Sequence, residues 1–205
     1  MDATELRKRQ APLKARFRDR PEEARVTLKA TGRVDDEDIV CKVETARSVV
    51  EAGLHPASGG SVQSVCSGDM LLQALVACAG VTLKAVAIAL DIRLRSSTVL
   101  AEGDLDFRGM MGVGNDAPVG FSDVRLRFEL EADATPAQRD RLIELTERYC
   151  VVYQTLRNSP RLGLQTEFVA AGHDHPPVGM EGVEEAEAEL QARLQALRAA
   201  ASHAL

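Results

Sequence analysis

The chain has 205 residues, of which 45% are hydrophobic and 3% aromatic, with no tryptophan. This length suits one domain with extensions, and its core must be built from aliphatic side chains. The formal net charge of -6 argues against a nucleic-acid partner, because such binding needs a concentrated basic surface.

Residues 1–22 predict a basic helical arm. Its charges are Arg7, Lys8, Arg9, Lys14, Arg16, Arg18 and Arg20. A run of this kind is usually a solvated helix, and here the acidic stretch Glu181–Glu189 offers it a partner within the same chain. No apolar h-region follows the N-terminus, so we expect a cytoplasmic protein.

The first strands are expected over Ala24–Thr31 and Ile39–Glu44, where apolar and polar residues alternate. The acidic turn Asp35–Asp38 between them predicts a hairpin. Cys41 falls on the more apolar face of the second strand, as a small buried hydrophobic residue would.

A long apolar helix is expected over Met70–Leu90, after the Gly/Ser/Pro loop His55–Ser64 and with Ser67 as its N-cap. Its length of about 30 Å equals the thickness of the hydrocarbon core of a bilayer. However, Lys84 lies inside the helix and no aromatic or basic residues flank its ends, which argues against a membrane span. A helix that is apolar all round is a central helix covered on every side. We therefore expect a second subunit to pack against this helix, and we do not expect the helix to lie in a membrane.

Further elements follow in regular order. Strands are expected over Ile92–Phe107 and Val124–Glu131, joined by the connection Gly109–Pro118. Thr135-Pro136 starts an amphipathic helix, or two abutting helices, that continues to Leu156. The apolar positions are Leu142, Leu145, Tyr149, Val152 and Leu156.

The chain ends in a strand, a linker and a helix. Gly163–Ala170 has a last strand pattern, Gly172–Gly182 is a linker, and the tail carries an apolar stripe. The order β-β-α-β-β-α-β, with a terminal helix, predicts an α+β fold in which an antiparallel sheet packs on central helices. The expected parts are the arm at residues 1–22, the domain at 23–171, and the linker with its amphipathic helix at 172–205.

The cysteines are Cys41, Cys66, Cys78 and Cys150. No CxxC or zinc-ligand spacing occurs, and His173-Asp174-His175 lies in a loop-forming segment, so we expect neither metal nor cofactor. Cys78 and Cys150 fall on the two central helices and could meet; by pattern alone, buried structural cysteines are the default. A reactive Cys78 needs a lowered pKa, and it lies too far along its helix for that helix's N-terminus to help.

Two segments resemble the signatures of the OsmC/Ohr family, the osmotically inducible and organic-hydroperoxide-resistance proteins. They are Cys66–Leu83, which ends its Ala-rich turns in Ala-Cys78, and Cys150–Leu156. The resemblance covers roughly Ala24–Ala170. It implies an intertwined homodimer that reduces organic hydroperoxides with Cys78 as attacking thiol and Cys150 as resolving thiol, and that is regenerated by a dithiol such as a lipoyl group.

The chain departs from this family pattern at three places. Asp69 stands where the family often has glutamate, and Val151 replaces the usual proline after the second cysteine. The arginine that activates the thiol has no clear equivalent; His55 and Arg47 are the candidates for its place. A cationic group near the sulfur would lower the pKa of the thiol.

Three functions therefore stay open. The first is a cysteine peroxidase in which Cys78 forms a sulfenic acid that Cys150 resolves. The second is a non-enzymatic dimer that binds a small apolar or lipid-like ligand, with both cysteines structural. The third is an interaction module that uses the basic arm and the C-terminal helix. Cys66, next to the helix start, is either a third redox thiol or an ordinary loop residue.

Overall fold

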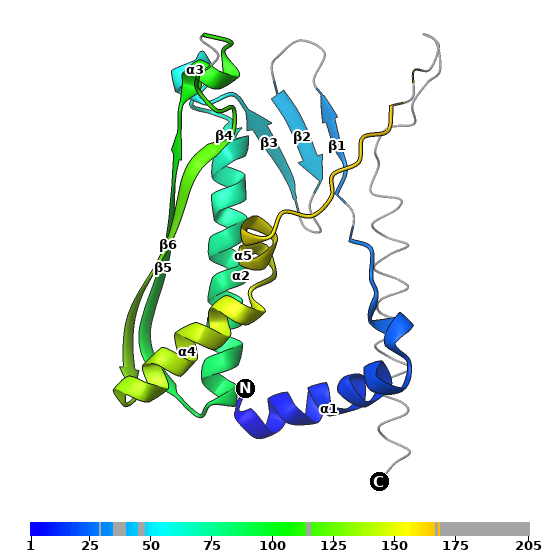
Figure 1. The fold of residues 1–205 in the computed structure, drawn as a ribbon, viewed down its shortest axis with the longest axis vertical. Helices are drawn as coiled ribbons and strands as arrows, with labels where there is room; N and C mark the ends of the chain where they lie inside the picture. The colour runs from blue at the N-terminus through cyan, green and yellow to red at the C-terminus, as the bar shows by residue number, and fades with distance from the viewer. Residues whose placement is uncertain (29, 35–39, 45–47, 114–115, 167, 169–205) are drawn as a thin grey trace. The chain divides into compact units, whose positions relative to one another are not determined.

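The computed structural model describes residues 1–28, 30–34, 40–44, 48–113, 116–166 and 168. Residues 1–161 form one compact unit and residues 162–205 a second. Among the described residues, the helices and strands belong to the first unit (Figure 1), and their mixture confirms the predicted α+β class. In chain order they are α1 (Ala3–Asp19), β1 (Gly32–Val34), β2 (Val40–Glu44), β3 (Val49–Gly53), β4 (Val65–Cys66), α2 (Ser67–Ala89), β5 (Arg93–Leu105), α3 (Phe107–Met110), β6 (Phe121–Asp133), α4 (Pro136–Tyr149) and α5 (Val151–Arg157).

The first four strands form one sheet in the order β1-β2-β3-β4. The pairs β1–β2 and β2–β3 are antiparallel, whereas β4 runs parallel to β3 through the pairs Ala52–Val65 and Gly53–Cys66. This pairing leads the chain straight from β4 into α2. Cys66, in extended conformation, is therefore the N-cap of α2, one residue before the predicted Ser67.

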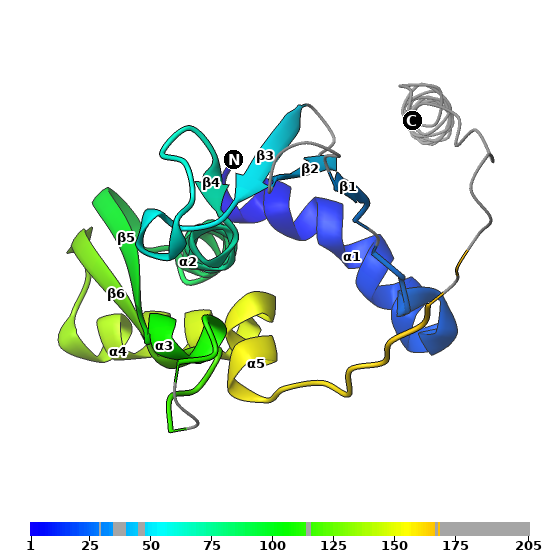
Figure 2. The same ribbon diagram turned by 90° about the horizontal axis from the view of Figure 1, so that it is seen from above.

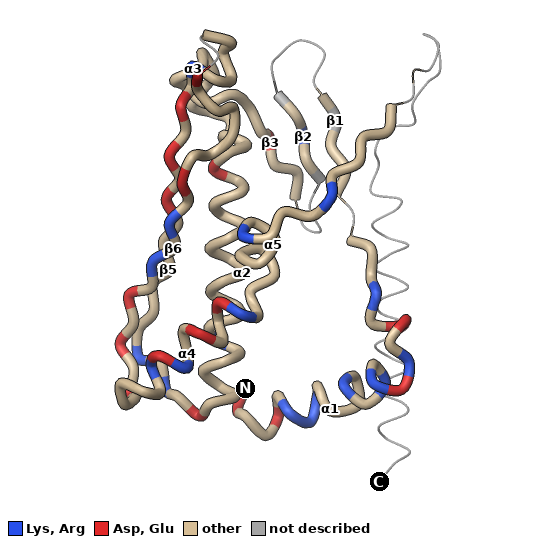
Figure 3. Tube along the Cα trace, in the orientation of Figure 1, with Lys and Arg blue, Asp and Glu red and all other residues tan. Residues whose placement is uncertain are grey.

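The second sheet is a long antiparallel ribbon of β5 and β6. Apolar residues of β6 face the core at alternate positions, as the sequence pattern predicts. Charged residues recur along both strands (Figure 3), and Arg125 forms an ion pair with Asp104 of β5 across the ribbon, Nη1 to Oδ2 2.5 Å. The alternation of apolar and polar residues in β6 thus gives the ribbon one face toward the core and one toward solvent.

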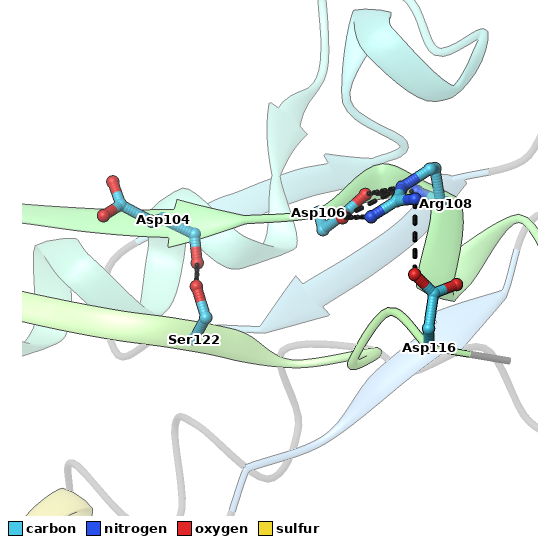
Figure 4. Close-up of polar contacts among 5 residues, drawn as sticks. All are labelled: Asp104, Asp106, Arg108, Asp116 and Ser122. Atoms are coloured by element: carbon cyan, nitrogen blue, oxygen red, sulfur yellow. Dashed lines mark hydrogen bonds and ion pairs between the residues drawn. The ribbon is translucent and has the colours of Figure 1, made fainter. Parts of the chain in front are cut away.

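The far end of the ribbon is closed by the short helix α3. Asp106 caps it by accepting a hydrogen bond from the backbone N–H of Arg108 at 3.0 Å, and its carboxylate also pairs with the Arg108 guanidinium. The same guanidinium lies 3.6 Å from Oδ2 of Asp116 on the returning segment, and Ser122 Oγ donates to the carbonyl oxygen of Asp104 at 3.1 Å (Figure 4). These polar contacts hold the turn that the sequence predicted only as a connection.

Helix α2 carries the core on one stripe. It packs mainly on β5, α4 and α5, with smaller contacts to α1 and β4; β5, α4 and α5 lie along one part of its circumference when it is viewed end-on (Figure 2). The buried residues of this stripe recur every three or four positions: Leu75, Ala79, Leu83, Val86 and Ala87. Elsewhere on the helix Val81 is 73% exposed, so within this chain α2 is covered on one side and not on every side.

By length and composition α2 is, within the described ranges, the single helix that could cross a membrane. Two core clusters bury part of its apolar surface, 28% of the apolar window. One joins Leu83 to Leu142 of α4 and Ile92, and the other joins Leu75 and Ala79 to Cys150.

The strand predicted over Ala24–Thr31 is wrong. Pro21–Ala24 is a turn of 3-10 helix, strand β1 begins only at Gly32, and Leu28 is 88% exposed. Alternation is local, whereas a strand needs a partner, and on the side of β2 away from β3 the paired residues are Gly32–Val34. The second predicted strand is confirmed as β2.

The last predicted strand is absent over 163–166, since these residues have no strand structure. The sequence analysis also missed β3 and β4, which surround the predicted loop. Arg47, the turn at 35–38 and the predicted tail helix lie outside the described residues.

Candidate active site

The corner between α4 and α5 places Cys150. Helix α4 starts at a capping box, in which Thr135 Oγ1 accepts from the Gln138 backbone N–H and the Gln138 side chain binds back to the Thr135 N–H. Cys150 ends this helix and also serves as the N-cap of α5, with an extended backbone (φ -73°, ψ 107°). The chain turns here, and the side chain of Cys150 is only 1% exposed.

Cys78 lies against this corner from the middle of α2. Its side chain is partly buried and packs on the cluster formed by Leu75, Ala79 and Cys150. Both cysteines are free thiols, and they pack against each other in the same core cluster. The structure therefore brings together the two cysteines that the sequence analysis singled out.

The surroundings of Cys78 favour its thiolate. Burial raises the pKa of the Cys78 thiol, but hydrogen bonds from the Val152 N–H, the Cys150 thiol, the Val151 N–H and the Thr82 hydroxyl together lower the pKa below its ordinary value. Hydrogen bonds to a charged form stabilise that form. Cys78 is thus the more acidic thiol of the pair.

Cys150 has the opposite tendency. Burial raises the pKa of its thiol, the hydrogen bond from the Tyr153 N–H opposes this, and the neighbouring Cys78 raises the pKa further. The net direction is upward.

The donors to Cys78 come from the backbone at the start of α5. The first amides of a helix have no partner within the helix and are free to bind other groups. Val151 and Val152 occupy these positions; both N–H groups contribute to the lowered pKa of Cys78, and that of Val152 also acts on Cys150. A proline at 151 would have no N–H, so the departure from the family signature at this position supplies one of the two donors.

The other predicted site residues lie elsewhere. His55 caps the short turn Pro56–Ser58, where Nδ1 accepts from the Ala57 N–H at 3.0 Å and the ring stacks on Phe107 with centroids 4.9 Å apart. None of the described partners of Cys78 is His55. Asp69 is an exposed residue in the first turn of α2.

The two remaining cysteines are both partly buried. Cys66 caps α2 next to Gly68, and Cys41 lies in β2 opposite Ala52. Neither is among the residues that surround Cys78 and Cys150. Within the described ranges, no three His, Cys, Asp or Glu side chains gather as a metal site would require.

A cavity of about 130 Å³ adjoins Cys150. Its walls are mostly apolar, with polar groups from Thr146, Glu147 and Tyr153; the other lining residues are Ala79, Leu126, Phe128, Ile143 and Cys150. A more open hollow of about 480 Å³ lies along the outer side of the α4–α5 corner and includes Arg148 and Gln154. Space for a small molecule therefore exists on both sides of Cys150.

Comparison with known proteins agrees with this arrangement. The family described as OsmC-like protein matches residues 59–165, slightly more than half of the chain. Among solved structures, an OsmC-like protein from Mycoplasma pneumoniae superposes with a TM-score of 0.55 at 15% identity, covering 65% of this chain and 89% of that one. An OsmC-like protein of unknown function from Vibrio cholerae gives a TM-score of 0.52 at 15% identity, with coverages of 64% and 94%.

No protein with a curated description matches the chain. The likeness to the solved structures, at such low identity, concerns the fold. The family match spans α2, the β5–β6 ribbon, α4 and α5, and so contains both Cys78 and Cys150. On this match and this fold, the chain belongs to the OsmC-like protein family.

Proposed function

We propose that this protein reduces organic hydroperoxides, with Cys78 as the attacking thiol and Cys150 as the resolving thiol. The observation that supports it most is the pair of free thiols packed together at the α4–α5 corner, in which the pKa of Cys78 is lowered and the pKa of Cys150 is raised. The thiolate is the nucleophilic form of cysteine, so the two environments assign the order of attack.

The reaction balances in two steps. The Cys78 thiolate attacks the outer oxygen of ROOH, the O–O bond breaks, and RO⁻ takes a proton to leave as ROH. The sulfur of Cys150 then attacks the Cys78 sulfenic acid, a disulfide forms, and the hydroxyl leaves as water. An external dithiol returns the two electrons by thiol–disulfide exchange, in the cytoplasm, where such reductants are kept reduced.

Mass spectrometry of the whole protein tests this proposal. One equivalent of cumene hydroperoxide is expected to form a Cys78–Cys150 disulfide within seconds, with loss of two hydrogen atoms. Cys78→Ser is expected to abolish both the disulfide and peroxide consumption. Cys66→Ser, which changes a thiol outside the pair, is the matched control and keeps both. If the wild-type thiols stay reduced with the hydroperoxide unconsumed, the peroxidase proposal fails.

We also propose that the protein is a homodimer. Helix α2 has exposed apolar residues, among them Leu71 and Val81. An apolar surface of this kind is typical of a protein–protein interface. Sedimentation at micromolar concentration is expected to give twice the chain mass of 22.1 kDa. Val81→Glu, a charge in the middle of this face, is expected to shift the species toward the monomer. A wild-type protein that sediments as a monomer contradicts the dimer.

A small apolar ligand is the second candidate, and the cavity beside Cys150 is the observation that favours it. Its volume of about 130 Å³ is close to that of engineered apolar cavities that bind benzene. In this case Cys78→Ser would keep full affinity for the ligand, because the substitution changes little volume. Peroxidase activity thus requires the sulfur of Cys78, whereas ligand binding does not.

A further inference from the structure

The cavity beside Cys150 lies where several elements of the core meet around a small side chain. Leu126 and Phe128 line it from β6, Ile143 from α4 and Tyr153 from α5. Ala79 of α2, which is 0% exposed, lies at its floor. Because alanine fills little space, the elements around it leave a void of about 130 Å³.

The polar groups in the wall of this cavity already have partners within the chain. Thr146 is 1% exposed, and its hydroxyl donates to the carbonyl oxygen of Leu142 at 2.7 Å. The Glu147 side chain is 39% exposed and its carboxylate pairs with Arg157, so this residue marks the side on which the cavity reaches solvent. A buried water molecule needs several polar partners, whereas a cavity with apolar walls accepts apolar molecules. The inner part of this cavity therefore suits an apolar group better than water.

The cavity and the proposed attacking thiol belong to the same core cluster. Cys78 packs on the cluster formed by Leu75, Ala79 and Cys150, and Leu126 of the cavity wall packs on it as well. Cys78 also directly precedes Ala79, the residue at the cavity floor. A molecule with an apolar group in the cavity thus lies against Cys150 and within the cluster that includes Cys78.

We propose that this cavity binds the organic group of the hydroperoxide and selects compact branched or aromatic groups, such as tert-butyl and cumyl, over long unbranched chains. An engineered apolar cavity of about 150 Å³ binds benzene, so a cavity of about 130 Å³ has room for one ring or one branched group. Leu126 and Ile143 limit its width from β6 and from α4. The choice of hydroperoxide rests on the proposed peroxidase function, whereas the binding of the apolar group does not.

The first test is the binding of cumyl alcohol, the product of cumene hydroperoxide reduction, followed by NMR of the ligand without any hydroperoxide. Leu126→Phe and Ile143→Phe fill the cavity from two different elements. Each is expected to weaken binding about tenfold, which corresponds to the loss of burial of about two methylene groups. Leu130→Phe is the matched control, because Leu130 lies on the same core face of β6 but packs on the other cluster, outside the cavity. It is expected to bind as the wild type does.

The second test compares kcat/KM for cumene hydroperoxide with kcat/KM for dodecyl hydroperoxide, which carries a long unbranched chain. The wild type is expected to prefer cumene hydroperoxide by at least about tenfold, and both filling variants are expected to lose most of this preference. Equal kcat/KM values for the two substrates in the wild type would overturn the proposed selection.

The binding measurement decides the site independently of turnover. A wild type that does not bind cumyl alcohol, or filling variants that bind it as tightly as the wild type, would overturn the assignment of the cavity. Binding that is lost in both filling variants, in a protein that consumes no hydroperoxide, would reject the peroxidase function and support the cavity as the binding site.

Discussion

Replacing Val151 by proline is expected to slow the alkylation of Cys78 near neutral pH by about tenfold, while the protein stays folded. Proline removes one N–H that donates to the Cys78 sulfur. A hydrogen bond to a charged group contributes about 1.5–3 kcal/mol, and about 1.4 kcal/mol corresponds to a factor of ten. The thiolate therefore forms at higher pH in the variant, so the rate difference is largest below the midpoint of the profile and vanishes above it.

The local backbone is suited to this substitution. Val151 is the first residue of α5, a position at which proline is favoured in helices. The preceding Cys150 has φ -73° and ψ 107°, the extended conformation that a residue before proline prefers. Val151→Ala keeps the N–H and is the matched control, with an unchanged profile. If Val151→Pro alkylates as fast as Val151→Ala at every pH, the Val151 amide does not activate the thiol.

The largest effect on stability is expected from Leu142→Ala. Leu142 is 1% exposed and joins α4 to Leu83 of α2 and to Ile92. Removing a fully buried leucine costs the transfer free energy of its side chain and leaves a cavity, together about 2–5 kcal/mol. Urea unfolding followed by circular dichroism is expected to show this loss as a lower midpoint at an unchanged slope.

Leu162→Ala provides the same chemical change at an exposed position, since Leu162 is 94% exposed. The free energy of unfolding is expected to change by less than about 0.5 kcal/mol. Both variants are compared at one protein concentration, because association would otherwise add to the apparent stability. Equal midpoints for the two variants would mean that the cluster around Leu142 does not support the fold.

The elements that local sequence predicts are those whose signal lies within the element itself. Helix α2 follows from a long, mostly apolar run, α4 from the capping pair Thr135-Pro136, and β6 from a strict alternation over eight residues. Ala24–Thr31 alternates equally well but has no strand beside it to complete its hydrogen bonds. The parallel pairing of β4 with β3 joins segments separated by a loop. Neither segment has a local sequence pattern that predicts this pairing.

The site divides in the same way. Cys78 and Cys150 were predicted because cysteines in a family signature are visible in the sequence, and the structure brings them together. The main-chain N–H groups that lower the pKa of Cys78 were not predicted, since the sequence pointed to the cationic candidates His55 and Arg47. Backbone N–H groups are present at nearly every residue and carry no sequence signal. The one available sign was Val151, whose presence in place of proline means that an amide donor exists there.

The use of main-chain donors affects how the site tolerates mutation. An activating arginine is lost by almost any substitution, because its charge belongs to its side chain. At 151 and 152 every residue type except proline carries the required N–H, so most changes in the gene at these codons would leave the acidity of Cys78 in place. Genetic variation at the corner is therefore limited mainly by the folding of α5 and hardly by the chemistry that α5 serves.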